Sequence, residues 1–304
     1  MQLRQCNTPR DAPGTRYCKH NDFDILFCGS DFVSIELNVS FVDKIDGRNL
    51  IKSKTVSTLT KNRGFGRDCT PVVYLKGHIY MFDCLFKDFS SIKQVEKYSI
   101  LNDSLESVGE IVDDYQGYFV CGFIDKIYLI GGFLNDEKTA TCRYFDTNDN
   151  TWGKVASMKE ARSSAACTVF EGRIVVAGGR GVNVSLNTVE CYDHIADEWS
   201  CMPSMIKRTC GHSLIAIRNK LIAIDDNIVQ VYDSTSNKFV AINNKHFFGY
   251  YAGAIPLGNK IIIFSINSTT ALCYDVDSNE WSKKSFCATT DDLNYFTKFP
   301  KLYF

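Results

Sequence analysis

The stretch "IYLIGGFLNDEKTATCRYFDTNDNTW", residues 127–152, contains an apolar strand, two adjacent glycines, a polar loop, a second strand and a turn that leads to a tryptophan. The same order of features returns in "RIVVAGGRGVNVSLNTVECYDHIADEW", residues 173–199. The two double glycines lie 47 residues apart, and so do the two tryptophans. This spacing indicates a repeated structural unit and not an isolated hairpin.

Weaker copies of the unit fill the rest of the chain. Residues 220–239 and 260–281 keep a Tyr-Asp pair and an aromatic residue six positions after the aspartate, but they lack the double glycine. Residues 24–49 and 78–105 are more divergent. The aspartate position of the six copies is occupied by Asp43, Ser99, Asp146, Asp193, Asp233 and Asp275. A period of 40 to 56 residues between short apolar strands predicts a β-propeller.

The repeat therefore predicts an all-β fold, a six-bladed β-propeller over residues 21–304, with residues 1–20 as an N-terminal tail. Gly, Asn and Asp between the strands favour hairpins. One blade cannot bury both of its faces alone, so neighbouring blades must pack radially. Residues 291–304 are expected to complete blade one and close the ring; a frayed tail is the alternative.

Two positions of the repeat have expected structural roles. The double glycine ends an inner strand, where a close approach of two backbones favours residues without a side chain. The aromatic position is expected to pack between neighbouring blades, and it is occupied by Trp152, Trp199, Phe239 and Trp281.

The bulk composition excludes several classes of protein. The net charge is −1, and clustered Lys and Arg are missing, so no nucleic-acid partner is expected. No apolar run reaches the length of a membrane span, so no membrane partner is expected. Thirteen cysteines are scattered singly without a C-x-x-C pair, which predicts reduced thiols and a cytoplasmic protein.

The sequence offers no constellation of catalytic residues. The five histidines show no metal-ligand spacing, and His212 is expected to be structural. "GFGRDC", residues 64–69, precedes a strand and not a helix, so it is interpreted as a loop. No enzyme activity, cofactor or metal is predicted, and an enzyme on a propeller scaffold is the least favoured of three function classes.

The double glycine, the Tyr-Asp pair, the six-residue step to tryptophan and the following Arg with a small-residue strand resemble the kelch repeat. "NTPRDAPGTRYCK", residues 7–19, resembles the linker that precedes the propeller in BTB–kelch proteins. No BTB or BACK region is expected in this chain, which would make it a fragment, a paralogue or a competitor for substrates. The resemblance implies a non-enzymatic protein-recognition domain, the substrate adaptor of a cullin-based ubiquitin ligase. An actin-binding or cytoskeletal scaffold is the alternative.

The resemblance also implies which residues contact a partner. In kelch propellers one face of the ring binds peptides, through a position thirteen residues before the second-strand aromatic and through the loop after the double glycine. The first set assigns Arg67, Tyr115, Arg162, Thr209 with the adjacent Arg208, and Gly249 with the adjacent Tyr250. The second set assigns Phe133, Arg180, Asn183, Asn227 and Asn267.

Three of these residues, Arg67, Arg162 and Arg180, could converge into a positive pocket. Guanidinium groups suit carboxylates, so a protein or peptide substrate with acidic residues is the expected partner, and actin is the alternative partner. The competing interpretation is that each arginine is a strand-end residue paired within its own blade.

Overall fold

The computed structural model describes residues 71–287, apart from residues 88–89, 100–101, 103, 112–114, 226–227, 243–250 and 266–269. It also describes the backbone of five strands between residues 22 and 59. All elements of this described part are strands and turns, and it contains no helix of the length and apolarity that a membrane span needs. The chain forms two compact units, one around residues 64–247 and one from residues 1–63 with 248–300.

The first unit contains four antiparallel sheets of four strands each, in which the strands follow one another in chain order. We call these sheets blades I to IV. Blade I is β6 (Val72–Leu75), β7 (His78–Lys87), β8 (Ser90–Ser99) and β9 (Ser104–Glu110); blade II is β11 (Phe119–Phe123), β12 (Lys126–Ile130), β15 (Cys142–Asp146) and β16 (Thr151–Val155). Blade III is β17 (Ala166–Phe170), β18 (Arg173–Ala177), β19 (Val189–Asp193) and β20 (Glu198–Met202); blade IV is β21 (Ser213–Ile217), β22 (Lys220–Ile224), β23 (Val229–Asp233) and β24 (Lys238–Ile242).

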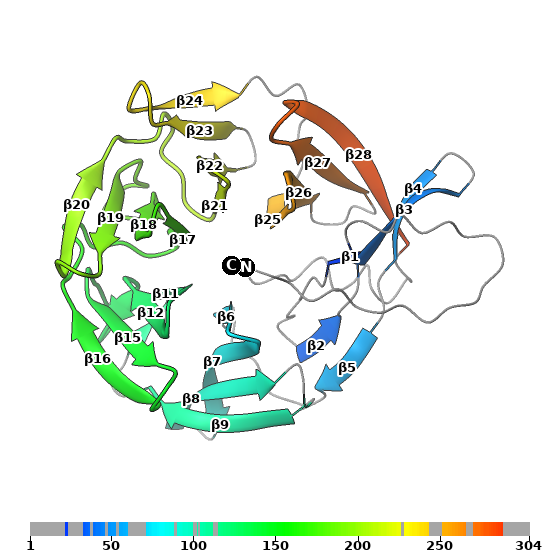
Figure 1. The fold of residues 1–304 in the computed structure, drawn as a ribbon. Helices are drawn as coiled ribbons and strands as arrows, with labels where there is room; N and C mark the ends of the chain where they lie inside the picture. The colour runs from blue at the N-terminus through cyan, green and yellow to red at the C-terminus, as the bar shows by residue number, and fades with distance from the viewer. Residues whose placement is uncertain are drawn as a thin grey trace. The chain divides into compact units, whose positions relative to one another are not determined.

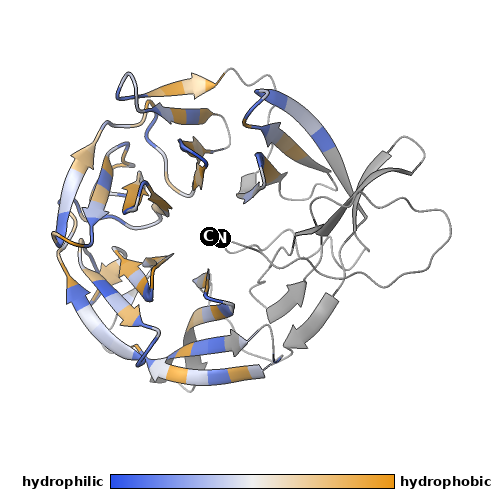
Figure 2. Cartoon of the chain, viewed as in Figure 1, coloured by the Kyte–Doolittle hydropathy of each residue, from blue (hydrophilic) through white to orange (hydrophobic). Residues whose placement is uncertain are grey.

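Within this unit the blades are arranged radially. The first strands β6, β11, β17 and β21 lie innermost and adjacent to one another, and the fourth strands lie outermost (Figure 1). Hydrophobic residues gather on the inner strands, as in β18, where four of five residues are buried (Figure 2). The sheets are therefore the blades of a β-propeller, as predicted from the repeat.

The second unit contains a fifth four-stranded meander, blade V: β25 (Tyr251–Leu257), β26 (Lys260–Ser265), β27 (Thr270–Asp275) and β28 (Glu280–Cys287). Strand β4 (Arg48–Lys52) pairs in parallel with β28 and continues this sheet through β3 (Val39–Ile45) and β1 (Asp22–Phe23). Strands β2 (Val33–Glu36) and β5 (Thr55–Leu59) form a separate pair. The first sequence copy thus adds strands to the edge of blade V, and the described strands do not include a separate four-stranded sheet from it. Residues 291–304 lie outside the described part, so the sixth blade and the closure of the ring remain predictions.

The repeat positions coincide in the register of the blades. Asp146 pairs with Thr151 and Asp193 with Glu198, at the same place in the turn between the third and fourth strands. Asp233 in blade IV and Asp275 in blade V occupy this place too. The prediction that these aspartates lie in equivalent turns is confirmed.

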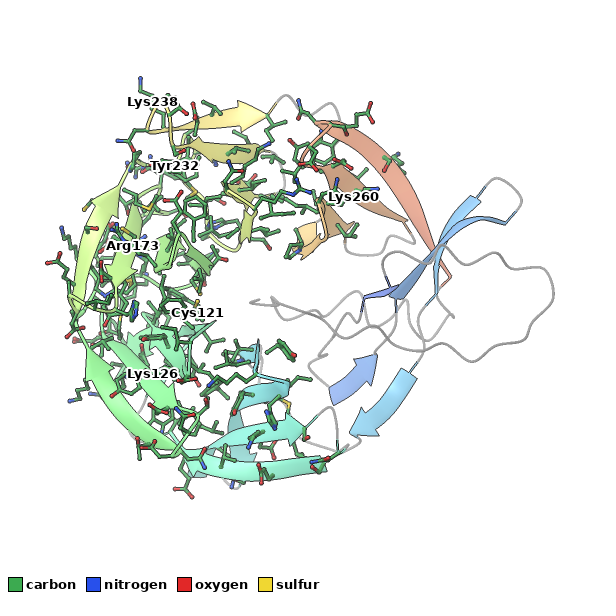
Figure 3. The ribbon with its side chains drawn as sticks, viewed as in Figure 1. Cys121, Lys126, Arg173, Tyr232, Lys238 and Lys260 are labelled. Atoms are coloured by element: carbon green, nitrogen blue, oxygen red, sulfur yellow. The ribbon has the colours of Figure 1, made fainter. Side chains whose placement is uncertain are left out.

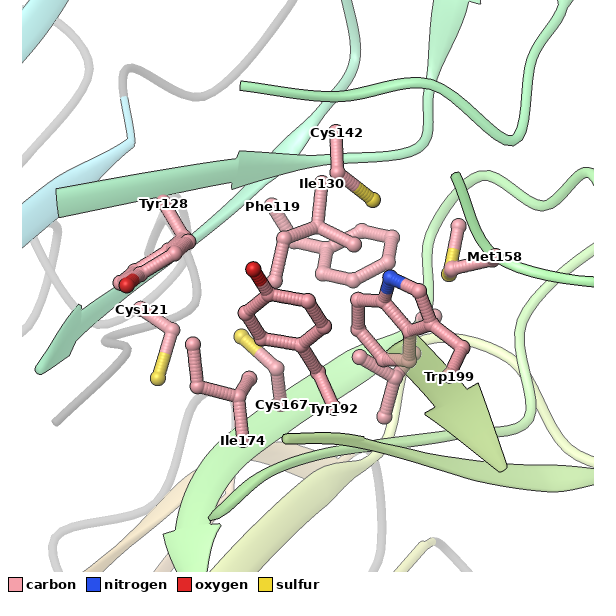
Figure 4. Close-up of a cluster of buried hydrophobic side chains, with 12 residues drawn as sticks. Phe119, Cys121, Tyr128, Ile130, Cys142, Met158, Cys167, Ile174, Tyr192 and Trp199 are labelled. Atoms are coloured by element: carbon pink, nitrogen blue, oxygen red, sulfur yellow. The ribbon is translucent and has the colours of Figure 1, made fainter. Parts of the chain in front are cut away.

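The aromatic position joins neighbouring blades, also as predicted. Trp199 lies in a cluster of buried side chains between blades II and III, packed on Tyr192 with 5.1 Å between the ring centroids (Figure 4). Its Nε1 donates to the carbonyl of Ala156 at the end of blade II, 2.9 Å away. Trp152 makes the same bond to Glu110 at the end of blade I. These bonds connect blade II to blade I and blade III to blade II. Side chains fill the space between the sheets of this unit (Figure 3).

The double glycines are required where two backbones meet. Gly178 and Gly179 have φ angles of 58° and 96°, a region that residues with a side chain rarely adopt. A Cβ atom on Gly178 would lie 2.6 Å from the carbonyl oxygen of Thr209. The amide of Gly179 donates to this same carbonyl. The end of the inner strand therefore contacts the connection to the next blade through the backbone alone.

Candidate protein-interaction site

The loop after the second double glycine, residues 178–188, is a closed and rigid structure between the second and third strands of blade III. Its ends are joined by the bond from the amide of Gly178 to the carbonyl of Thr188, and Leu186 N–H donates to the carbonyl of Gly179. A third bond, from Gly181 N–H to the carbonyl of Val184, closes the tip. The tip is exposed: Val182 is 76% and Val184 is 52% accessible.

Arg162 is fully buried and stabilises this loop through hydrogen bonds. Its Nη1 donates to the carbonyls of Gly178 and Thr188, the two ends of the loop. Its Nη2 lies 2.6 Å from a carboxylate oxygen of Glu190, which is 2% exposed. A partner cannot reach this guanidinium, and its position agrees with the interpretation of a strand-end arginine paired within its blade.

In blades II, III and IV, the position that Arg162 occupies in blade III holds a buried side chain. Arg162 lies beside Glu190 of the third strand, whose carboxylate also accepts from the amides of Lys159 and Glu160. At the equivalent register of blade IV stand Thr209, which is buried, and Gln230, whose side-chain oxygen accepts from the amides of Ile206 and Lys207.

Blade II uses a different pair at the same two positions. Tyr115 in β10 (Tyr115–Gln116) is completely buried, and its hydroxyl donates to the carbonyl of Thr141 at 3.0 Å. The guanidinium of Arg143 lies 5.4 Å from the centre of its ring, a favourable cation–π geometry. Burial raises the pKa of the Tyr115 hydroxyl well above its ordinary value. The side chain of Tyr115 is therefore a core group and is not available to a partner.

Arg180, Asn183 and Arg208 are the predicted contact residues that the structure exposes. Arg180 exchanges two backbone hydrogen bonds with Ser163, and its Nε lies 3.5 Å from the sulfur of Cys210. Arg208 lies on the connection between blades III and IV, two residues before Cys210. These three side chains thus lie on the loop and on the connection beside it.

Phe133 belongs to a small sheet at the same end of blade II. Strands β10, β13 (Phe133–Leu134) and β14 (Glu137–Lys138) form this sheet, and Phe133 is half-buried in it. Lys138 Nζ donates to the carbonyl of Gly181 at 2.5 Å. The small sheet therefore supports the 178–188 loop from the side of blade II.

Four predicted contact residues, Arg67, Asn227, Tyr250 and Asn267, lie outside the described residues. Of the three arginines in the predicted pocket, Arg180 is exposed and Arg162 is buried. The third, Arg67, is not described. The exposed valines 182 and 184 were not among the predicted contacts. Their signal was present in "GRGVNVSLN", where apolar residues occupy a loop that is otherwise polar.

Among its described residues, this surface includes no metal site. Within the described part of the chain, no three His, Cys, Asp or Glu side chains are grouped so that they could hold a metal ion. The seven cysteines whose side chains the structure describes, among them Cys210, are free thiols. The surface offers apolar, amide and guanidinium groups, a combination typical of protein contacts.

Comparison with known proteins assigns the repeat. Residues 116–159 and 161–206 each match a family described as Kelch motif. These ranges correspond to blades II and III with the connections that follow them. Blades II and III are thus kelch repeats, a type of repeat that generally serves protein interaction.

Similar proteins are kelch proteins that are longer than the matched region. Kelch-like protein 23 of Homo sapiens is 24% identical over 187 residues, which are 57% of this chain and 34% of that protein. Kelch repeat and BTB domain-containing protein 2 of Pongo abelii is 26% identical over 165 residues, 47% of this chain and 26% of that protein. A putative F-box/kelch-repeat protein of Arabidopsis thaliana is 37% identical over 163 residues, 51% of this chain and 40% of that protein. The chain spans less than half the length of these curated relatives.

Proposed function

We propose that this chain is a non-enzymatic recognition domain that binds a protein substrate of a cullin-based ubiquitin ligase system. The proposal is supported by the kelch motifs in blades II and III and by relatives whose names combine a kelch region with a BTB domain. In BTB–kelch proteins, to which the chain is similar, the BTB region holds the cullin scaffold and the kelch region selects the substrate. The proposed domain extends over residues 21–304 and acts in the cytoplasm.

The observation that carries the proposal is the rigid 178–188 loop with its exposed tip. Val182 and Val184 present apolar surface, and the amide side chain of Asn183 lies between them in the sequence. The loop is held by its own backbone bonds, by Arg162 and by Lys138. A binding surface that is already ordered loses little conformational entropy when a partner binds.

The partner chemistry follows from the side chains that remain accessible. Arg180 at the base of the tip can donate to a carboxylate, and the two valines can cover an apolar side chain. We therefore expect a substrate segment in which an apolar residue stands near an acidic one. This requirement is narrower than the acidic peptide that was expected for the positive pocket predicted from the sequence.

The test compares proteins captured by the wild-type chain with those captured by Val182→Ser/Val184→Ser and by Arg180→Ala. Lys154→Ala, on the exposed outer strand of blade II, is the matched control. Substrates are expected to be lost with both loop variants and kept with the control. Their half-life should then be measured with and without the chain: an adaptor shortens it, and a competitor without ligase activity lengthens it.

Two outcomes would contradict the proposal. Captured proteins that do not depend on the loop would show that the surface is elsewhere. Loop-dependent partners with an unchanged half-life, together with co-sedimentation of the chain with filamentous actin, would favour the scaffold function.

A further inference from the structure

A second exposed apolar site lies at the opposite end of blades II and III from the 178–188 loop. Because each blade is an antiparallel meander, the turns between strands one and two and between strands three and four share one end of the sheet. We call them the inner turn and the outer turn. The site is formed by the inner turn of blade II and the outer turn of blade III.

The outer turn of blade III carries an exposed apolar side chain, Ile195. Ile195 is 86% exposed, the most exposed large apolar side chain in the described part of the chain. Its amide donates to Asp193 at 2.9 Å, as Asn148 does to Asp146 and Thr235 does to Asp233. The backbone geometry is therefore shared, but the other two turns have a polar residue where blade III has isoleucine.

The inner turn of blade II also carries an exposed isoleucine, and its backbone conformation is unfavourable for this residue type. Ile124 has a φ of 59° and is 53% exposed. The equivalent positions in blades I, III and IV have the same left-handed backbone but hold Lys76, Glu171 and Arg218. A β-branched residue is the least suited to a left-handed backbone conformation. At Ile124 the protein therefore has both backbone strain and an exposed apolar side chain.

The two turns are in contact. The ring of Phe123, next to Ile124, meets the ring of His194, next to Ile195, at 5.0 Å between centroids and at right angles. Phe123 in turn packs on the buried cluster between blades II and III. Each isoleucine therefore follows directly in the chain on one ring of this contacting pair.

The charges around this pair favour a basic partner. Three cations of the neighbouring inner turns already have partners: Lys76 pairs with Asp125, Arg173 pairs with Asp193, and Lys126 lies over the ring of Tyr144. Two further carboxylates, Asp197 and Glu198, stand two and three residues after Ile195 in the chain. Hydrogen bonds from the amide of Ala156 and the hydroxyl of Tyr192 lower the pKa of Asp197, which keeps it charged at neutral pH.

We propose that Ile124 and Ile195 form a second docking surface, which binds a partner-protein segment with an apolar side chain next to Lys or Arg. This surface is separate from the 178–188 loop, so the domain can hold two proteins at once. The strain at Ile124 is explained if its side chain serves binding and not folding.

The test uses two fluorescein-labelled twelve-residue peptides with the same central leucines, flanked by lysines in one and by glutamates in the other. The full chain is expected to bind the lysine peptide in preference to the glutamate peptide, and salt should weaken this binding. Ile195→Thr, which copies blade IV, and Ile124→Asn, which suits a positive φ, should each weaken binding about five-fold. Val182→Ser/Val184→Ser at the other end of the blades is the control and should bind normally.

Thermal unfolding separates binding from folding. Ile124→Asn should keep or raise the melting temperature while it loses affinity, because it relieves backbone strain. The proposal is overturned if the lysine peptide shows no saturable binding, if the glutamate peptide binds as well, or if both isoleucine variants bind like the wild type. Loss of binding in the loop control as well would also overturn it, since the two surfaces would then not be separate.

Discussion

The buried pair of Arg162 and Glu190 gives the sharpest test of the fold. Replacing Arg162 with threonine removes a guanidinium that makes hydrogen bonds to two loop carbonyls and to a carboxylate 2.6 Å away. Glu190 would then be a buried carboxylate without its counter-ion. Breaking one partner of such a pair costs about 3–5 kcal/mol of unfolding free energy.

Blade IV supplies the matched control for this change. It holds Thr209 and Gln230 at the positions of Arg162 and Glu190, and the glutamine oxygen still accepts two backbone amides. The double variant Arg162→Thr/Glu190→Gln therefore restores a neutral pair that the same fold already uses. We expect it to be more stable than Arg162→Thr alone, with a coupling of about 2 kcal/mol between the two sites.

Urea unfolding of the wild type, Arg162→Thr, Glu190→Gln and the double variant measures this coupling. The free energies of unfolding are compared through the transition midpoints, at a constant dependence on urea concentration. Losses that simply add would refute the reasoning, because they would show that Glu190 does not depend on Arg162 for its charge balance. Affinity for a captured substrate should be unchanged in the folded fraction of each variant, provided the 178–188 loop keeps its shape. A selective loss of affinity without loss of stability would instead support a contact role for Arg162.

Four further outcomes can be checked. Trp199→Ala should cost about 3–5 kcal/mol by denaturant unfolding, and Trp199→Phe only about 1 kcal/mol, since phenylalanine keeps most of the packing and loses the hydrogen bond. Thiol titration of the denatured chain without reductant should count close to thirteen cysteines, and a count several lower would reveal disulfides. Folding lowers the pKa of the Asp197 carboxyl, so this group stabilises the folded protein above its unfolded-state pKa, and the stabilisation is lost as pH falls through the folded-state pKa. The stability of Asp197→Asn in acid should therefore depend less on pH than that of the wild type. Asparagine suits this place, since Asn237 occupies it in blade IV. Arg67 stands thirteen residues before Tyr80 in the sequence, as Arg162 stands before Val175, and the buried Glu96 has the register of Glu190. On this basis Arg67→Thr should lower the melting temperature, and Arg67→Thr/Glu96→Gln should recover part of the loss.

The sequence alone determined the repeat and most of its local structure. A fixed period, strand-like runs and turn residues are local properties, and they locate the strands of blades II to V. The double glycines and the aromatic position were interpretable because each has a single physical reason: a close backbone approach at Gly178 and a contact between blades at Trp199. The same repeated spacing predicted that Asp146 and Asp193 occupy equivalent turns.

Only the tertiary structure decided which side chains face solvent. Arg162 and Arg180 are both arginines at the same end of one blade, yet one is buried against Glu190 and the other is exposed. The difference arises from a residue 28 positions further along the chain, whose carboxylate compensates the charge of Arg162. The buried hydroxyl of Tyr115 also has a partner, because it donates to the carbonyl of Thr141. Burial of a polar group depends on the partner that packing brings to it, and spacing within a repeat carries no information about that partner.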